Sequence, residues 1–411
     1  MLGDSLDNIF DLFRNIDKKL ESPEKIAKEI EDEFLQQKLA TMSKVFDLTI
    51  EFIVKKQGVL YGGFAINEML PNELKFYDKL TLPDYDCFIK NAPEVAKELA
   101  DLLISKKHAY TEVKNALHEH TYKIFSNFEA VADFTELNAM EQQLIRDTAI
   151  QLNYKKHKIL VCSRNVLKAF AYIELCTPMS ASHRWIKVYQ RTLLFENTFP
   201  VMSVTNEAIS DVLKSRYIIP KSLKQPYTAI RDYLVQEGVV FCGAVSVGKY
   251  LKSGSSLSGP KRIEALSTEP ERHLEAIVHL LEKMKTVVKV VTHNSYEHLI
   301  PVYVEIFVRN DTSKFEKVLT LFDSTNHCFS YFNDRGKKFS SIYFELYKMY
   351  IFSAIYGSNK KDDLIIQHLV KAYSTSKNNF THECYGNFKT MSAIKKSVWD
   401  NNKKIVFYRP K

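Results

Sequence analysis

The stretch from Gly58 to Asp86 limits what this chain can fold into more than any other. It opens with a short apolar run, continues through Gly62-Gly63 and ends in the acidic pair Asp84 and Asp86. Glycine lets a backbone turn sharply and approach a ligand closely. The apolar residues after the glycines recur at helical spacing, so we expect a strand, a tight turn and a short helix. The free N–H groups at the start of such a helix suit a phosphate.

Asp84 and Asp86 fall in a segment expected to be a strand, where alternate side chains share a face. A third aspartate, Asp133, lies within residues 121–137, an aromatic and β-branched run that predicts one neighbouring strand. Buried carboxylates need partners, and metal ligation supplies them. We therefore predict that the three aspartates are catalytic and hold two Mg²⁺ or Mn²⁺ ions. Asp84 and Asp86 would bridge the ions, and Asp133 would bind the one that activates the attacking hydroxyl.

Three short segments carry a resemblance to a known family: 60–67, 83–88 and 131–134. They resemble the core of the polymerase-β-type nucleotidyltransferases. Within that superfamily they are most similar to the poly(A) polymerase catalytic subunits of poxviruses and related nucleocytoplasmic large DNA viruses. The Gly-Gly pair, where many members have Gly-Ser, is shared with these viral proteins.

The resemblance implies an α+β fold, with ATP as substrate and an RNA 3′ end as acceptor. It assigns the triphosphate to Gly62 and Gly63, and Asn67 in the same motif is a further candidate for nucleotide binding. It also implies a second, degenerate nucleotidyltransferase-like domain, and either a homodimer or a processivity subunit as partner. The expected location is the cytoplasm of an infected host cell, with packaging in the virion as a further possibility.

A row of basic residues follows the predicted catalytic sheet. Arg184, Lys187 and Arg191 are spaced to share one face of a helix. They are candidates for contact with the triphosphate or with an RNA backbone, and a solvated helix face is the equal alternative. Trp185 is expected to pack in the core rather than stack on a base.

The sequence repeats itself weakly. Residues 231–243 echo residues 51–63 at an offset of 180, which pairs Gly58 with Gly238 and Gly63 with Gly243. In this second copy Arg262-Ile263-Glu264 stands where the acidic pair is expected. The strand at 302–308, read as the counterpart of the third-acid strand, holds only Glu305. The second copy is therefore predicted to be a scaffold that binds no metal.

These patterns predict three parts: a helical segment at residues 1–56, the catalytic domain at 57–215 and the degenerate domain at 216–411. Two helices are expected in the first part, separated at Ser22-Pro23. The second of them should bury Phe34, Leu35, Leu39, Met42, Phe46 and Phe52. The prolines of residues 220–226 predict a linker, and residues 252–262 a flexible basic loop.

The C-terminal part has two notable segments. Residues 339–356 are apolar all round, which predicts a helix buried against its own domain or against a second subunit. The basic residues 394–409 are a candidate extension of an RNA track, although charge runs are usually solvated.

Composition adds bounds rather than a function. The net charge of +8 favours an anionic partner without proving one. Six scattered cysteines show no C-x-x-C spacing, which we interpret as structural thiols in a reducing setting. Neither a secretory signal nor a membrane span is expected. Two alternative functions stay open: a nucleotidyltransferase with a non-RNA acceptor, and a non-catalytic RNA-binding or assembly subunit.

Overall fold

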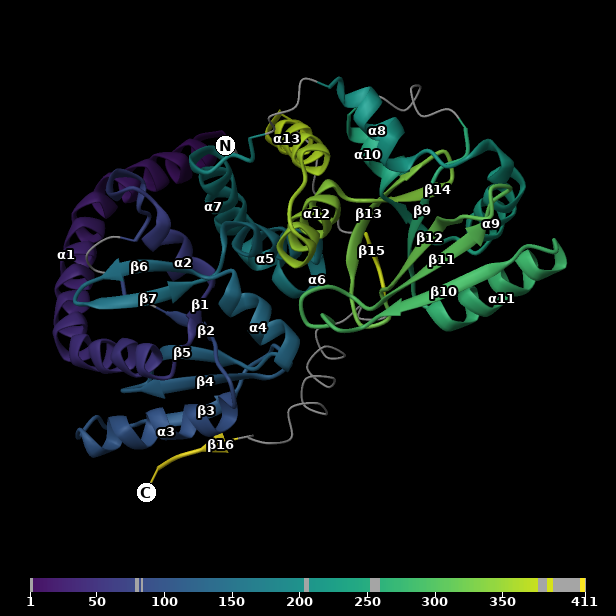
Figure 1. Cartoon of the computed structure of the whole chain (residues 1–411). Coiled ribbons are helices and arrows are strands. Elements are labelled where there is room, and N and C mark those ends of the chain that lie inside the picture. Colours follow the sequence, from purple (N-terminus) through teal and green to yellow (C-terminus); the bar gives the residue numbers. More distant parts are fainter. Residues whose placement is uncertain are drawn as a thin grey trace.

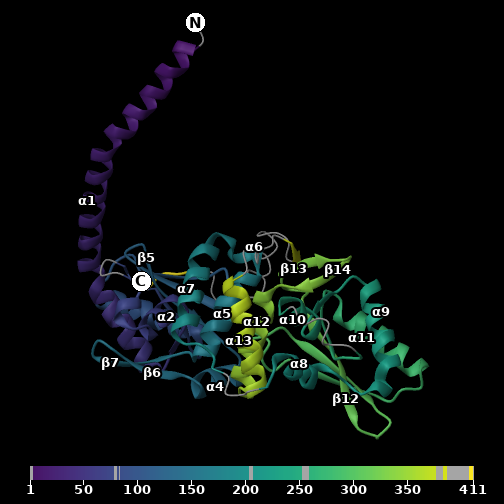
Figure 2. The same ribbon diagram turned by 90° about the horizontal axis from the view of Figure 1, so that it is seen from above.

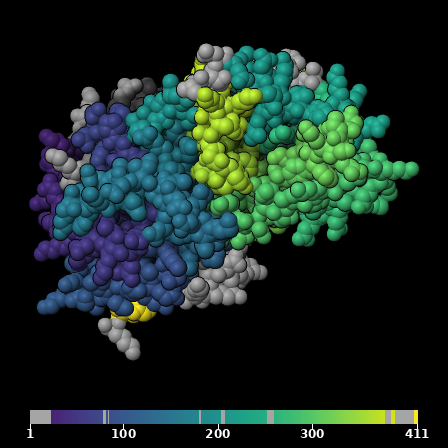
Figure 3. Space-filling view, viewed as in Figure 1, coloured from purple at the N-terminus to yellow at the C-terminus, as the bar shows by residue number. Residues whose placement is uncertain are grey.

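The computed structural model describes residues 3–77, 81–82, 84–202, 207–251, 259–375, 383–386 and 407–410, with side chains from residue 23 onward except those of residues 180–181. The chain forms two lobes, each built on a sheet of eight strands. Two helices from late in the sequence lie between the lobes (Figure 1), and the space-filling view shows them in yellow-green at the surface between the blue and the green halves (Figure 3).

The N-terminal segment is one helix, α1 (Gly3–Lys55), with Pro23 inside it. The predicted break at Ser22-Pro23 is therefore wrong. The first half of α1 projects away from the body along a curved path (Figure 2), where a proline can bend a helix without disturbing neighbours. Met42, Phe46 and Phe52 are buried as predicted, whereas Phe34 is 63% exposed and Leu35 and Leu39 are half-buried. Only the last turns of α1 reach the core.

The first lobe carries the segments singled out as catalytic. Its elements in chain order are β1 (Val59–Leu60), α2 (Gly62–Met69), β2 (Tyr85–Phe88), α3 (Ala92–Ser105), β3 (Glu112–Asn115), β4 (Thr121–Ser126), β5 (Glu129–Thr135), α4 (Ala139–Asp147), β6 (Ile150–Tyr154), β7 (His157–Val161) and α5 (Arg164–Cys176). The helices α6 (Pro178–Ala181), α7 (Trp185–Thr198) and α8 (Ile209–Tyr217) follow, with 3-10 turns at Asn72–Leu74, Ser182–Arg184 and Lys221–Leu223.

The second lobe repeats the alternation of helices and strands. Its elements are α9 (Lys224–Gln236), β8 (Val240–Cys242), α10 (Ala244–Tyr250), β9 (Ile263–Ser267), α11 (Pro270–Lys283), β10 (Val288–His293), β11 (Tyr303–Arg309), β12 (Phe315–Asp323), β13 (Phe329–Asp334), β14 (Lys337–Ser340), α12 (Ile342–Tyr356), α13 (Lys360–Thr375) and β15 (Cys384–Tyr385). The last strand, β16 (Phe407–Tyr408), pairs with β3 and so joins the first sheet.

The two sheets have the same topology. The first runs β16-β3-β4-β5-β2-β1-β7-β6 and the second runs β10-β11-β12-β9-β8-β14-β13-β15. From β3 to β6 and from β10 to β13, each pairing is parallel or antiparallel in the same sequence of directions. The expected duplication of the unit is therefore confirmed, and with it the α+β fold class.

The predicted offset of 180 between the two repeated segments is one residue too small. Gly62 and Gly243 both have a positive φ, +69° and +64°. Gly62 is the first residue of α2, and Gly243 directly precedes α10. Gln57 and Gly238 likewise match, at +56° and +66°. The structural offset in this region is thus 181, and the Gly58–Gly238 identity is accidental. Backbone conformation decides the alignment because a positive φ is tied to one position in each turn.

This register identifies the counterparts of the three aspartates. Asp86 pairs with Asp133 across parallel strands, and Glu264 pairs with Thr320 in the same way. Arg262, directly before β9, corresponds to Asp84, directly before β2. The strand at 302–308 was the wrong counterpart, because β12 rather than β11 takes the place of β5. The second unit therefore has Arg, Glu and Thr where the first has three aspartates.

The apolar helix of the C-terminal part is α12, which packs against α5 and lies between the lobes (Figure 1). It is buried on all sides within this chain. A buried polar network secures the contact. Lys168 Nζ lies 2.6 Å from Glu196 Oε2 and donates to Phe199 O at 2.6 Å, while Tyr350 Oη on α12 donates to the same Glu196 oxygen at 2.9 Å.

Other segments differ from expectation. Residues 220–226 are not an extended linker: α9 begins at Lys224 with Pro226 in its first turn, where proline is tolerated. Cys328 and Cys384 form a disulfide, contrary to the expected reduced thiols, while the other four cysteines are free and buried. The predicted 215/216 domain boundary falls inside α8, and the domain boundaries stay a prediction.

Two predicted basic segments fall largely outside the described residues. These are positions 252–258 of the basic loop and all of 394–409 except 407–409. Within the described part of the chain, no helix has both the length and the apolarity to cross a membrane.

Candidate active site

The site is built around the turn between β1 and α2. Gly62 has φ +69°, and a Cβ at this position would lie 2.1 Å from Asp86 Oδ2. A Cβ on Gly63 would lie 2.5 Å from Tyr77 Oη and 2.7 Å from Arg191 Nη1. No larger residue fits at either position without displacing these groups. The glycines let the start of α2 approach the acidic strand.

The acidic side chains come from two adjacent parallel strands. Asp86 on β2 pairs directly with Asp133 on β5, so the two side chains point to the same face of the sheet. Asp84 lies one residue before β2 and is exposed. Its charge raises the pKa of both other aspartates. The structure thus brings the three predicted carboxylates to one face, beside the glycine turn.

A lysine that the sequence analysis missed completes this cluster. Lys123 on β4 pairs with Asp133 across antiparallel strands, and its Nζ lies 2.8 Å from Asp133 Oδ1. Burial alone would lower the pKa of Lys123, but the carboxylates of Asp133, Asp84 and Asp86 outweigh burial and raise it. Lys123 therefore stays protonated and offsets part of the negative charge of the three aspartates.

Ionisation of Asp86 and Asp133 is unfavourable in this environment. Burial, then the neighbouring Asp84 and Asp133, raise the pKa of Asp86 well above its ordinary value. Burial raises the pKa of Asp133 to about 6, although Lys123 opposes the shift. Closely spaced carboxylates with raised pKa values are typical of a binding site for a multivalent cation when no cation is bound. Among the residues that the structure describes, however, no group of three or more Asp, Glu, His or Cys has metal-holding geometry.

The predicted basic row lies next to these acids. Arg184 lowers the pKa values of Asp86 and Asp133, and Asp84 acts on Lys187, so the charges interact across the site. Arg184 Nη1 is 3.4 Å from Glu174 Oε2. Trp185 packs partly against the core and its indole donates to Glu174 O at 2.9 Å, consistent with the expected packing role.

Arg191 reaches the glycine turn itself. Its guanidinium carbon lies 4.1 Å from the Phe76 ring centroid and 5.1 Å from that of Tyr77. Burial lowers the pKa of Arg191, and hydrogen bonding to Tyr77 opposes this. The residue is thus held over Gly63 by two aromatic rings.

The side chain of Asn67 is hydrogen-bonded to neighbouring parts of its own chain. Its Oδ1 accepts hydrogen bonds from the backbone N–H groups of Phe76 and Tyr77, both at 3.0 Å, and its Nδ2 donates to Glu68 Oε1 at 2.9 Å. Asn67 therefore positions the segment that carries Tyr77, which in turn faces Gly63 and Arg191. Its predicted contact with a nucleotide stays a prediction.

Lys123 and Tyr77 were missed for different reasons. Residues 121–137 were predicted as one strand, but they form a hairpin whose two-residue turn is Asn127-Phe128, with φ values of +48° and +67°. Asparagine at the first turn position is the signal that was available. Once the hairpin is recognised, Lys123 falls opposite Asp133. No sequence signal pointed to Tyr77.

Comparison with known proteins agrees with this geometry. Residues 47–181 match the model of a family described as the poly(A) polymerase catalytic subunit. A provisionally named poly(A) polymerase catalytic subunit of African swine fever virus (isolate Pig/Kenya/KEN-50/1950) is 32% identical over 171 residues, which are 39% of this chain and 34% of that protein. A similarly named protein of Acanthamoeba polyphaga mimivirus is 26% identical over 182 residues, 43% of this chain and 29% of that protein.

A solved structure extends the likeness to most of the chain. The crystal structure of the Megavirus polyadenylate synthase superposes with a TM-score of 0.73 at 16% identity, covering 96% of this chain and 84% of that one. The fold of both lobes is therefore shared. The aligned region spans about a third of the length of the African swine fever virus relatives. The resemblance noted from the sequence motifs is confirmed, and it is concentrated on the lobe that holds the aspartates.

Proposed function

We propose that this chain is a template-independent poly(A) polymerase that adds AMP from ATP to RNA 3′ ends. The observation that carries the proposal is the direct pairing of Asp86 with Asp133, beside a glycine turn that a Cβ at Gly62 would close. This arrangement sits within the segment that matches the poly(A) polymerase family. The shared fold of the Megavirus protein supports the same class of enzyme.

The acidic residues fit a divalent cation. Asp84, Asp86 and Asp133 supply carboxylate oxygens, the ligands that Mg²⁺ and Mn²⁺ prefer. Burial, together with the neighbouring negative charges, raises the pKa values of Asp86 and Asp133, and Lys123 opposes these shifts. Bound Mg²⁺ or Mn²⁺ would add positive charge that neutralises the triphosphate and the developing charge on the reacting oxygens.

The glycine turn is the proposed seat of the triphosphate. The first N–H groups of α2 have no partner within the helix, and no side chain caps them. They belong to Gly62, Gly63 and the residues that follow, next to Asp86 and Arg191. Arg191 over Gly63 and Lys187, both on α7, and Arg184 directly before α7 would supply positive charge along the phosphate chain.

Asp133 is the proposed acceptor for the proton of the RNA 3′-hydroxyl. A pKa of about 6 leaves it mostly ionised at neutral pH yet basic enough to accept a proton. Lys123 engages its Oδ1, so Oδ2 is the oxygen that would take the proton. Lys123 thus orients the carboxylate as well as neutralising part of its charge.

The decisive experiment is primer extension. Purified protein is incubated with a labelled oligoribonucleotide, Mg²⁺ or Mn²⁺, and each NTP in turn. We expect ladders with ATP. Asp84→Asn, Asp86→Asn and Asp133→Asn should each reduce the rate by about a thousandfold or more, because each removes a charge from the reacting centre. The control is Asp147→Asn, an exposed carboxylate at the end of α4 in the same lobe.

Two outcomes would replace the proposal. Transfer of labelled nucleotide to an acceptor other than RNA would indicate a different nucleotidyltransferase. RNA binding without metal-dependent extension, in wild type and variants alike, would indicate a binding subunit. The proposed cytoplasmic location and a second subunit or second copy as partner derive from the resemblance to viral enzymes.

A further inference from the structure

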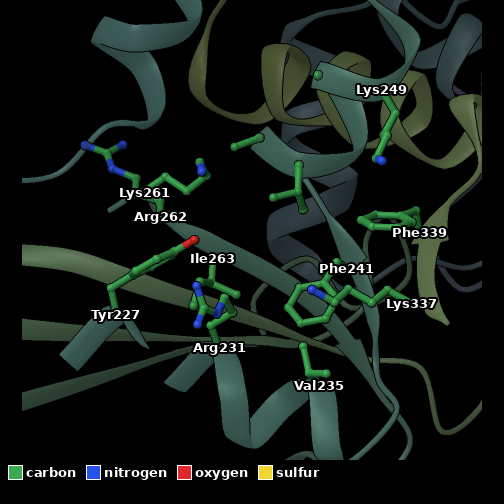
Figure 4. Close-up of a pocket in the computed structure, with 13 residues that line it drawn as sticks. Tyr227, Arg231, Val235, Phe241, Lys249, Lys261, Arg262, Ile263, Lys337 and Phe339 are labelled. Carbon is green, nitrogen blue, oxygen red and sulfur yellow. The ribbon is translucent and has the colours of Figure 1, made fainter. Parts of the chain in front are cut away.

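The degenerate unit contains a cavity of about 410 Å³ that the proposed catalysis does not use. Its floor includes Phe241 and Ile263, and α9, α10 and β14 form its walls (Figure 4). Phe241 and Ile263 alternate along their strands with Cys242 and Glu264. The cavity therefore opens on the face of the sheet opposite to the one that carries Glu264. It is a separate place from the degenerate counterpart of the active site.

The cavity exists because aromatic side chains have been replaced. In the first unit Tyr85 and Phe64 pack edge to face with ring centroids 4.8 Å apart, and Tyr154 packs on Phe64 at 5.1 Å. The register assigns Ile263 to the position of Tyr85 and Val245 to that of Phe64. The β13–β14 hairpin ends before the position of Tyr154. One unit fills this space with rings, and the other leaves it open.

The lining is strongly cationic. It includes Arg231, Lys249, Lys261, Arg262 and Lys337, and none of the 13 lining residues has a carboxylate. Arg231 and Lys249 pair with acids outside the lining, Asp232 and Asp334. Across the described ranges no ion pair joins the other three cations to an acid.

One of those three is also unsatisfied. Arg262 Nε is buried and has no hydrogen-bond partner within the described part of the chain. Burial, together with the charge of Arg231, lowers the pKa of Lys261. Positive charge is thus concentrated in a space where it has no internal counterion, which is costly unless an anion enters.

The walls also carry ring faces. Lys249 Nζ lies 5.2 Å from the ring centroid of Phe339, and Arg231 Cζ lies 5.6 Å from that of Tyr227. Figure 4 shows Tyr227 on one side of the cavity and Phe339 on the other, with Lys337 extending over Phe241. Rings beside cations are the equipment with which proteins hold nucleotides, since bases stack on aromatic faces while phosphates meet Lys and Arg.

We propose that this cavity is a nucleotide-binding site, occupied either by a nucleotide unit of single-stranded RNA or by a free nucleotide. A volume of about 410 Å³ lies within the range of small-ligand pockets. The phosphate would meet Lys261 and Lys337, and the base would lie against the aromatic walls. Loss of the metal-binding acids from the second unit would then accompany the gain of a cationic pocket on its other face.

Two variants test the site by independent means. Val245→Phe restores the bulk of Phe64 and fills the cavity without changing its charge. Lys337→Glu reverses an exposed charge on the rim and leaves the packing intact. The matched control is Lys314→Glu, an exposed lysine in the turn between β11 and β12 that does not line the cavity. All are made in the full chain, and the melting temperature of each is recorded.

Binding is measured without turnover, so the result does not depend on the proposed catalysis. The probes are a fluorescein-labelled 15-nucleotide oligoadenylate, followed by anisotropy in EDTA, and 5′-AMP, followed by calorimetry. We expect both cavity variants to weaken at least one probe by about fivefold or more, and the control by less than about twofold. Weakening of the oligonucleotide alone identifies RNA as the source, and weakening of 5′-AMP identifies a free nucleotide.

The proposal is overturned if Lys337→Glu binds both probes as wild type does. It is also overturned if Lys337→Glu and Lys314→Glu weaken binding equally, because the effect would then be that of overall charge. If Val245→Phe melts well below wild type, the decision rests on Lys337→Glu against its control.

Discussion

Asp86 and Glu264 occupy the same position in two sheets of the same topology. Each lies beside a glycine with positive φ, and each glycine has its missing Cβ directed at the acid. Their surroundings differ. Asp86 faces Asp84 and Asp133, whereas Glu264 forms a buried ion pair with Lys348 on α12. The same position thus adds to a cluster of negative charge in the first unit, through Asp86. In the second unit its carboxylate, Glu264, is neutralised by Lys348.

Gly62→Ala should abolish extension activity. Alanine at φ +69° costs about 1–2 kcal/mol of stability, and its Cβ would also displace Asp86. The matched control is Gly238→Ala, which has φ +66° but open space around the new methyl. We expect a similar backbone penalty in the control with extension activity retained. Equal loss of activity in the two variants would disprove the role of the close approach.

Asp133→Asn should change how stability depends on pH. Folding raises the pKa of Asp133 from 3.8 to about 6. The folded state therefore holds the proton more tightly, and wild type loses stability as the pH rises from about 4 to about 6. The shift corresponds to about 3 kcal/mol at most. Urea unfolding in EDTA at pH 5.0 and 7.5 should show this loss reduced in the variant. Asp147→Asn should behave as wild type, and an unchanged slope in Asp133→Asn would contradict the assigned pKa.

Lys123→Met should strengthen the binding of a divalent cation in the absence of nucleotide. The ammonium group competes with a metal for Asp133 Oδ1, from which it lies 2.8 Å. Its removal takes away the positive charge that contacts Asp133, so Mn²⁺ affinity measured by electron paramagnetic resonance should rise by about threefold or more. Lys158→Met, an exposed lysine on β7, is the control. Weaker Mn²⁺ binding in Lys123→Met would argue against a metal between these acids.

Lys168→Met should be the most destabilising of these changes. Lys168 and Glu196 are almost fully buried, and the lysine also bonds Phe199 O. Removing one partner of a buried ion pair typically costs about 3–5 kcal/mol. The double variant with Glu196→Gln should recover part of that loss. Denaturant unfolding of wild type, both single variants and the double variant measures this coupling, and additive losses would show that the two residues act independently.

The sequence was informative where function depends on local pattern. The glycine turn and the closely spaced acids follow from neighbouring residues. So does the apolar helix, although it begins at Ile342 and residues 339–340 end β14. The comparisons bear out the resemblance, and the structure bears out the fold class. The basic row was found by its spacing, and its proximity to the acids was not predictable. That proximity depends on how α7 packs, which periodicity does not encode.

The features that could not be predicted from the sequence depend on tertiary contacts. Lys123 could be placed opposite Asp133 only by knowing that the chain reverses at Asn127-Phe128. The helix continues through Pro23 and follows a curved path in this part of the chain (Figure 2). Phe34 was predicted to be buried because it fits an apolar stripe, but the stripe extends beyond the body of the molecule (Figure 2). The offset between the two repeated segments was wrong by one residue because matching glycines were aligned, whereas the positions with positive φ are the ones that correspond.

The strand β16 has a mechanical consequence for the molecule. The chain completes the second sheet and then returns to the first, where Tyr408 Oη donates to Asp101 Oδ1 at 2.7 Å and Arg409 Nη2 lies 3.1 Å from Glu112 Oε2. A strand of two residues binds weakly by itself, but its attachment to the same chain keeps its local concentration high. The C-terminal part of the chain therefore holds on to both lobes, through β15 in the second sheet and β16 in the first.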